Sequence, residues 1–255
     1  MNIERLKQIE NIIGEVINIE LLNEQGWTSK VSRVQTETHT YLLKSAFTKR
    51  YRSWLVREAY VLETLQSTLL PVPTYYGFFE DEEGSHLIMS FEEGMTLRKA
   101  FSLAKTEQEK CKLMNSFGEL IRKLHELPLN EPLRKSVPWL DGQLKQAEIN
   151  LHEGGTDGND VLLEKLHAEK PAPILETMIH GDCTMENVLV RDGKVETFID
   201  VADLTIGDPR YDVALAVRRF TDHPQYIDAF YDGYQRLTIS KEEYAYFDQG
   251  LYEFF

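Results

Sequence analysis

An Asp-Gly pair, Asp192 and Gly193, lies between two short apolar runs and constrains this chain more than any other local feature. A two-residue hairpin turn of type I′ needs positive φ at both central positions, and Asp and Gly tolerate that conformation. The pair therefore predicts a β-hairpin in which Asn187 lies opposite Phe198. Because Asp200 follows two residues later, we expect its side chain and that of Asn187 to emerge at the same end of the hairpin.

Three oxygen-bearing side chains are grouped around this hairpin in the sequence. Asn187 and Asp200 supply an amide and a carboxylate oxygen, which are ligands that suit Mg²⁺. Asp182 precedes Asn187 by five residues, the spacing between catalytic aspartate and metal-binding asparagine in kinases. The pattern predicts Asp182 as the base of a phosphoryl transfer and the other two residues as metal ligands. The alternative is that they are only turn formers and a strand end, but all three positions together are harder to explain in that way.

A lysine closes the apolar run 41–44 in the first part of the chain. Burying the ammonium group of Lys44 without a partner would be costly. Glu58 comes three residues after Leu55 and four before Leu62, so it lies on the apolar stripe of a predicted helix. We expect a Lys44–Glu58 ion pair whose lysine also binds nucleotide phosphate. The competing interpretation is a solvated lysine and a glutamate at the edge of the stripe.

The 255 residues suit one large domain or two packed lobes. β-like runs dominate the first ninety residues, whereas helical periodicity dominates the rest. We expect an α+β fold with a β-rich lobe at 1–91 and a mainly helical lobe at 92–255. The expected elements are strands at 31–36, 40–45, 78–80 and 86–91, helices at 51–66 and 107–125, a loop at 154–160, and β structure within 175–200.

The motifs of the second half resemble those of the aminoglycoside phosphotransferase and choline kinase superfamily. They are HGDCTMEN at 180–187, FID at 198–200, GDP at 207–209 and Asp212 in DPRYDVAL. The resemblance extends to GELIRKLH at 118–125 and to an insertion at 139–166. It implies a bilobal protein-kinase-like fold, with ATP or GTP as co-substrate and Mg²⁺ as cofactor. Asp182 would be the base, and Asn187 and Asp200 the metal ligands.

The remaining nucleotide and structural residues follow from the same resemblance. It implies that hinge backbone at Ser90, Phe91 and Glu92 holds the nucleotide, and it assigns phosphate contacts to Gly26 and Ser29. The segment 23–30 departs from the family because it contains one glycine. His180 is expected to orient the catalytic loop, Asp208 to cap a helix starting at Pro209, and Asp212 to be structural. The chain lacks the HRD, DFG and APE motifs of protein kinases, which argues against a peptide acceptor.

The net charge of −14 disfavours nucleic acid or an anionic membrane surface as a partner, and it permits a cationic acceptor. The chain looks most like the 3′-type aminoglycoside branch, which implies acids that bind ammonium groups. The candidates are Glu148, Glu153, Asp157, Asp160, Glu253 and the carboxylate of Phe255. For each, a solvated surface acid is the simpler explanation, and only joint placement beside Asp182 would make a site. Choline, homoserine, amino sugars and macrolides remain alternative acceptors, as does a catalytically silent kinase-like binding module.

Cys111 and Cys183 are too few for a disulfide framework and are wrongly spaced for zinc. The stretch 1–20 carries charges throughout and lacks the apolar block of a secretory signal. We expect a cytoplasmic monomer or homodimer.

Overall fold

The computed structural model describes residues 3–26 and 28–255, so Trp27 of the predicted phosphate loop lies outside the described residues. By their internal contacts, the residues form two compact units. The first unit is Met1–Glu93 with Thr197–Asp203, and the second unit is Gly94–Glu196 with Leu204–Phe255. In the described ranges, every helix is too short or too polar to cross a membrane.

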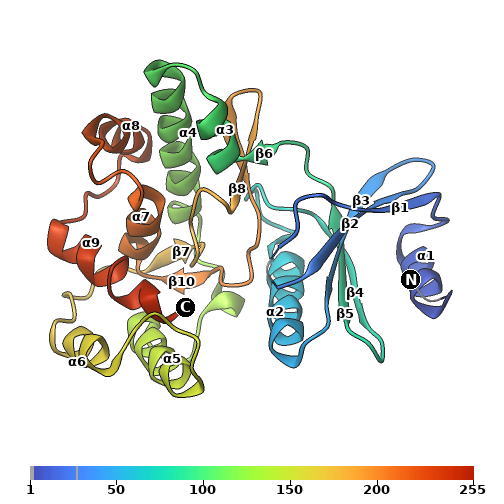
Figure 1. Cartoon of the computed structure of the whole chain (residues 1–255), viewed down its shortest axis with the longest axis horizontal. Helices are drawn as coiled ribbons and strands as arrows, with labels where there is room; N and C mark the ends of the chain where they lie inside the picture. Colours follow the sequence, from blue (N-terminus) through green and yellow to red (C-terminus); the bar gives the residue numbers. More distant parts are fainter. Residues whose placement is uncertain (1–2, 27) are drawn as a thin grey trace. The chain divides into compact units, whose positions relative to one another are not determined.

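The first unit is built on a five-stranded antiparallel sheet (Figure 1). Its strands follow the order β1-β2-β3-β5-β4. The predicted strand pairs are confirmed, although β4 starts three residues earlier than expected, with a bulge between Tyr75 and Gly77. The bounds are β1 Asn18–Leu21, β2 Lys30–Gln35, β3 Thr40–Ala46, β4 Tyr75–Glu80 and β5 Ser85–Ser90.

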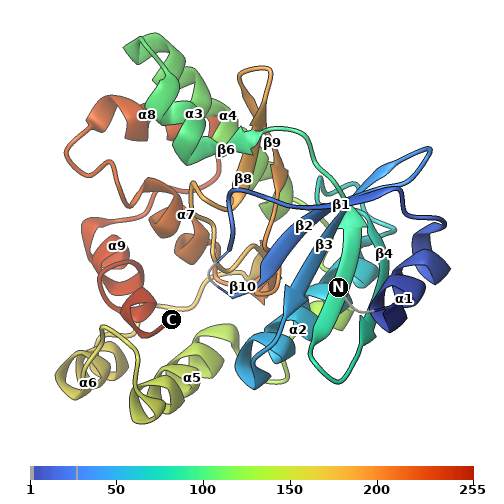
Figure 2. The ribbon, with the colours of Figure 1, turned by 45° about the vertical axis from the view of Figure 1, so that its right-hand side comes forward.

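Two helices cover opposite faces of this sheet, as Figure 2 shows from a second direction. Helix α1, Ile3–Ile13, packs Ile9 against Leu43 and its neighbours on one face. Because side chains alternate along a strand, Lys44 points to the other face. There lies helix α2, Lys49–Leu65, which begins at the N-cap Thr48 and agrees with the helix predicted at 51–66.

The second unit is mainly helical (Figure 1). Its longest helix, α4, spans Glu107–His125 as predicted and packs along α8, Pro224–Tyr234. Glycines allow this close approach, because a Cβ on Gly118 would lie 2.1 Å from the carbonyl oxygen of Phe230. The other helices are α3 Leu97–Leu103, α5 Trp139–Glu153, α6 Asp160–Ala168, α7 Pro209–Val217, α9 Lys241–Phe247 and the 3₁₀ turns η1 Glu131–Leu133 and η2 Leu251–Phe254.

In the part of the chain that the structure describes, five short strands lie between the helices of the second unit and form two small sheets. Strands β7 and β10 pair with each other, and β6, β8 and β9 form a second small sheet. Asp192 and Gly193 adopt φ of 52° and 77°, so the predicted hairpin turn is confirmed. The bounds are β6 Met95–Thr96, β7 Thr177–Ile179, β8 Val188–Arg191, β9 Lys194–Phe198 and β10 Thr205–Gly207.

An aromatic core joins the insertion to the end of the chain. Trp139 at the start of α5 packs against Tyr211 of α7, with 5.0 Å between ring centroids. Phe247 of α9 and Phe254 of η2 are fully buried in the same cluster. Through these contacts η2 packs against α5, so the last residues of the chain are fixed within the second unit (Figures 1 and 2).

Candidate active site

The first unit holds the predicted lysine between two carboxylates. The Nζ atom of Lys44 lies 2.7 Å from Oε2 of Glu58, so the expected ion pair is confirmed. It also lies 2.9 Å from Oδ1 of Asp200. Burial alone would lower the pKa of Lys44, but the charges of Glu58 and Asp200 outweigh it and raise that pKa. The ammonium group therefore stays cationic and available to phosphate oxygens.

Asp200 reaches this lysine through the returning segment Thr197–Asp203. The backbone N–H of Phe198 donates to the carbonyl oxygen of Pro71 at 2.9 Å, which anchors the segment to the first unit. Asp200 itself has φ of 56°, a left-handed conformation that costs roughly 1–3 kcal/mol for most residues and that Asp tolerates better than most. Surrounding contacts hold the carboxylate in this conformation beside Lys44.

The predicted nucleotide residues lie in two segments of the first unit. Gly26 follows β1, and in the described ranges the buried hydroxyl of Ser29 has no hydrogen-bond partner. The hinge begins at Ser90, whose N–H already donates to the carbonyl oxygen of Thr74 at 2.9 Å. The Ser90 hydroxyl contacts Glu92, and the ring of Phe91 packs 4.4 Å from the guanidinium of Arg33. The Ser90 N–H is therefore occupied, and nucleotide binding by the backbone of Ser90, Phe91 and Glu92 stays a prediction.

In the second unit, Asp212 fixes the loop that carries Asp182. Its Oδ2 accepts from the N–H of His180 at 2.7 Å, and its Oδ1 accepts from the N–H of Gly181 at 2.9 Å. His125 at the end of α4 lies 3.1 Å from the same carboxylate. All of these polar groups except Gly181 are buried, and Gly181 has φ of 84°. The structure therefore gives Asp212 the loop-supporting contacts expected of a structural residue.

The loop-orienting and capping contacts expected nearby are also present. Nδ1 of His180 accepts a 3.3 Å hydrogen bond from the N–H of Asp182. Asp208 caps α7 by accepting from the N–H of Arg210, with Pro209 as the first helical residue. Cys183 is buried, and burial raises the pKa of its thiol, so it behaves as a packing residue.

Asn187 orients the carboxylate of Asp182. Its Nδ2 donates to Oδ2 of Asp182 at 2.7 Å and to the carbonyl oxygen of Asp182 at 2.8 Å. Because both partners are acceptors, the nitrogen must face Asp182 and the amide oxygen must face away. This orientation suits a cation ligand. Asp182 and Asn187 belong to the second unit and Asp200 to the first, so the meeting of all three at one metal ion stays a prediction.

Tyr252 contacts the catalytic loop and was not among the predicted site residues. Its hydroxyl donates to Oδ1 of Asp182 at 3.2 Å, from the C-terminal turn η2. The sequence signal for it is weak: it is a tyrosine next to Glu253, which was chosen for its charge alone. The structure thus adds a neutral donor to the residues around Asp182.

The predicted acceptor-binding acids separate into two groups. The carbonyl oxygen of Glu253 accepts from the N–H groups of Asp157 and Gly158 at 3.0 and 2.9 Å, so the insertion loop and the C-terminal turn are joined. Phe255 follows this turn and is half exposed. Glu148 instead lies on α5 and pairs with His167 at 3.1 Å, while Asp160 and Glu153 are exposed at the ends of helices.

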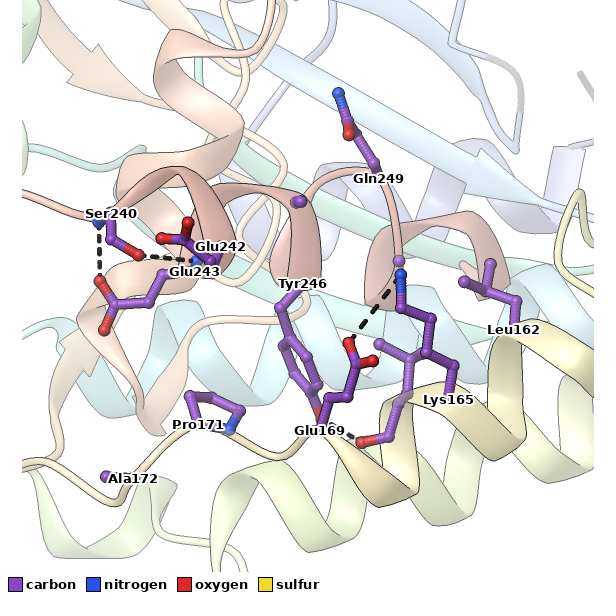
Figure 3. Close-up of a pocket in the computed structure, with 13 residues that line it drawn as sticks. Leu162, Lys165, Glu169, Pro171, Ala172, Ser240, Glu242, Glu243, Tyr246 and Gln249 are labelled. Carbon is purple, nitrogen blue, oxygen red and sulfur yellow. Dashed lines mark hydrogen bonds and ion pairs between the residues drawn. The ribbon is translucent and has the colours of Figure 1, made fainter.

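A separate pocket of about 620 Å³ lies between α6 and α9 (Figure 3). Its polar groups contact one another: Lys165 lies 3.8 Å from Glu169, and the Tyr246 hydroxyl donates to the carbonyl oxygen of Leu166. None of the predicted acceptor-binding acids is among the described residues that line it. We therefore do not assign the acceptor to this pocket.

Comparison with known proteins shows the same family along most of the chain. The profile described as the phosphotransferase enzyme family matches residues 20–247. An aminoglycoside 3′-phosphotransferase from Streptomyces fradiae is 29% identical over 217 residues, which are 78% of each chain. The crystal structure of an aminoglycoside 3′-phosphotransferase of type VIII has a TM-score of 0.76 and 25% identity, covering 94% of this chain and 93% of its own.

A third protein has the same fold at lower identity. It is an aminoglycoside phosphotransferase from Streptomyces rimosus, solved in complex with ADP and streptomycin, with a TM-score of 0.71 and 18% identity. The alignment covers 95% of this chain and 96% of that one. Together these matches confirm the family resemblance and the bilobal α+β fold class expected from the sequence.

Proposed function

Because the chain belongs to the phosphotransferase enzyme family and is a small-molecule O-phosphotransferase, we propose that it phosphorylates a hydroxyl group of an aminoglycoside. The phosphoryl donor would be ATP or GTP, by analogy with the ADP bound to the relative from Streptomyces rimosus. The similarity to aminoglycoside 3′-phosphotransferases favours this acceptor class over choline, homoserine, amino sugars and macrolides.

The observation that carries the proposal is the joined C-terminal turn and insertion loop. Tyr252 of this turn contacts Asp182, and the carbonyl oxygen of Glu253 accepts from the N–H of Asp157. The carboxylates of Asp157, Glu253 and Phe255 lie on these joined segments, and in the proposal they face the acceptor beside Asp182. Carboxylates attract ammonium groups and form charge-assisted hydrogen bonds with them. An acceptor with several amino groups matches this surface, and the net charge of −14 agrees.

Asp182 would act as the base in this reaction. The oxygen of the acceptor hydroxyl forms a bond to the γ-phosphorus, and the bond between that phosphorus and the β–γ bridging oxygen breaks. The nucleoside diphosphate leaves, and the acceptor proton passes to Asp182. Because the transition state is loose, orientation and charge neutralisation supply most of the catalysis. The two donors on Asp182, Asn187 and Tyr252, would keep its carboxylate oriented.

The donor side would be held by the lysine cluster of the first unit. Lys44, fixed by Glu58, would bind phosphate oxygens, with Gly26 and Ser29 as further phosphate contacts. The hinge backbone at Ser90, Phe91 and Glu92 would hold the nucleobase. The amide oxygen of Asn187 and the carboxylate of Asp200 are hard ligands that fit Mg²⁺. Such an ion, when bound, neutralises charge on the phosphates.

Replacing Asp182 with asparagine tests the proposed base with little change in size. We expect loss of acceptor phosphorylation by a factor of about 10² or more, since a general base typically contributes 10²–10⁴-fold. Asp222→Asn, at an exposed loop position, is the matched control and should keep wild-type turnover. Product is measured by mass spectrometry with MgATP and MgGTP. Unchanged turnover in Asp182→Asn would refute the assignment of the base.

A ligand panel separates the acceptor classes. Ligands that bind only the folded state raise the melting temperature. Aminoglycosides, choline, homoserine, an amino sugar and a macrolide are compared by thermal shift with a nonhydrolysable nucleotide, and then by product formation. The proposal predicts that aminoglycosides alone give both a shift and a phosphorylated product. A silent binding module would give no product with any acceptor.

A further inference from the structure

Tyr252 and Asn187 bind the two oxygens of one carboxylate. The Tyr252 hydroxyl donates to Oδ1 of Asp182 at 3.2 Å, and Nδ2 of Asn187 donates to Oδ2 at 2.7 Å. Asn187 lies five residues from Asp182, whereas Tyr252 comes from the opposite end of the second unit's sequence. The carboxylate is therefore held from both sides, by one local and one distant donor.

The tyrosine is a donor and is fixed in place. Burial raises the pKa of Tyr252, and the nearby charge of Asp182 raises it further, so the phenol stays protonated at working pH. Its ring packs against the guanidinium of Arg218, which lies 4.3 Å from the ring centroid. Arg218 is in turn held by Asp248 at 2.9 Å. The packing of Arg218 on the ring thus helps to hold the hydroxyl at Asp182.

The turn that carries Tyr252 is also bound to the insertion loop. Besides the two hydrogen bonds to the Glu253 carbonyl oxygen, Nδ2 of Asn150 donates to the carbonyl oxygen of Phe254 at 2.9 Å. A Cβ on Gly158 would lie 2.5 Å from the Phe254 ring, so loop and turn are in close contact. A shift of the insertion loop would therefore move Tyr252.

We propose that Tyr252 is a positioning residue, which holds the carboxylate of Asp182 through its hydroxyl and links it to the acceptor-binding loop. The inference rests on the proposed role of Asp182 as base. A carboxylate offers about four acceptor positions, so the tyrosine and an acceptor hydroxyl can bind it together. The hydroxyl of Tyr252 and the amide of Asn187 hold one carboxylate oxygen each, which fixes the orientation of the carboxylate. Tyr252 therefore keeps the base aligned with the acceptor hydroxyl, an effect on the chemical step rather than on acceptor binding.

Tyr252→Phe removes the hydroxyl and keeps the ring on Arg218. The loss of this hydrogen bond frees one carboxylate oxygen, so kcat should fall by roughly 3- to 10-fold while KM for the acceptor stays within about twofold. Tyr226→Phe is the matched control, because its hydroxyl donates to Glu107 at 2.6 Å and not to Asp182. That variant should keep the wild-type kcat and KM. Melting temperatures of both variants show whether either is unfolded.

The outcomes distinguish this inference from the proposed function. A lowered kcat with an unchanged KM in Tyr252→Phe, and wild-type kinetics in Tyr226→Phe, support the positioning role. Equal kcat in both variants, with Asp182→Asn still inactive, would overturn the positioning role and leave the base assignment intact. Activity retained in Asp182→Asn would overturn both. If Tyr252→Phe melts below the assay temperature, the kinetics are compared below its melting temperature, where a kcat equal to that of wild type would likewise overturn the positioning role.

Discussion

The contact between α4 and α8 depends on two glycines, and adding a methyl group to either should push the helices apart. A Cβ on Gly118 would lie 2.1 Å from the carbonyl oxygen of Phe230, and one on Gly233 would lie 2.0 Å from that of Asn115. Cβ atoms in proteins essentially never lie closer than 3.0 Å to another heavy atom, so α8 must move by about 1 Å in either variant. The opposing atoms are backbone and cannot rotate away.

The size of the effect follows from two opposing contributions. Overpacking of this kind costs roughly 1–3 kcal/mol, and backbone atoms on the opposing helix place it near the upper end. Alanine returns about 1 kcal/mol through its better helix propensity. The net loss in each variant is about 2 kcal/mol, or roughly 4–8 °C in melting temperature for a chain of this size.

The two substitutions should not be additive. Once α8 has moved to accept one methyl group, the second meets a wider gap, so the double variant should lose clearly less than about 4 kcal/mol. Gly142→Ala in α5 is the control, because its Cβ would meet only a methyl of the half-exposed Val137, at 3.2 Å. It should melt at or above the wild-type temperature. Calorimetry measures the melting temperatures of the two single variants, the double variant and the control. A wild-type melting temperature for Gly118→Ala, or a double variant that loses the full sum of the two single losses, would refute the reasoning.

Two further substitutions test the charge clusters of the first unit. Glu58→Gln removes one of the two carboxylates that contact buried Lys44. Breaking a buried ion pair costs roughly 3–5 kcal/mol, and because Asp200 remains, we expect the free energy of unfolding to fall by an amount near the lower end of that range. Nucleotide binding should weaken as well. Denaturant unfolding and calorimetric titration with MgATP measure both, and wild-type values in both would contradict the role of the pair. In Asp81, burial would raise the pKa, but Arg5 and the N–H of Gly84 outweigh it, so the pKa lies below the usual 3.8. Its stabilisation is complete above about pH 3.8 and is lost as pH falls further. Asp81→Asn should therefore melt below wild type at neutral pH, with a gap that narrows in acid, and a gap independent of pH would contradict this assignment.

Local patterns were sufficient to predict much of the fold. Strands β2 to β5 of the first unit were predicted, whereas the short strand β1 was not, and α4 follows from the spacing of its buried residues. The Asp192–Gly193 turn needed only the backbone preferences of two residue types. The Lys44–Glu58 pair was predictable because a buried ammonium group needs a charged partner. Helix α1 was not predicted, although Ile9, Ile12 and Ile13 have helical spacing.

Contacts between distant parts of the chain could not be predicted in this way. Tyr252 binds Asp182 across 70 residues, and its position depends on how η2 packs against α5. Likewise, no sequence spacing indicated that Asp200 would contact Lys44, 156 residues away. Charge alone placed Glu148 with the acceptor acids, and its contact with His167 could not be predicted, while its role toward the acceptor stays a prediction. Each of these depends on tertiary packing rather than on propensity or period.

The returning segment Thr197–Asp203 has a consequence for how this protein can be divided. A gene cut between codons 93 and 94 would yield an N-terminal fragment that retains Lys44 but lacks Asp200 and the peptide that binds Pro71. Any design for fragment complementation, fusion or domain exchange with relatives should therefore keep the seven returning residues with the N-terminal piece. In the sequence they follow that piece by about a hundred residues.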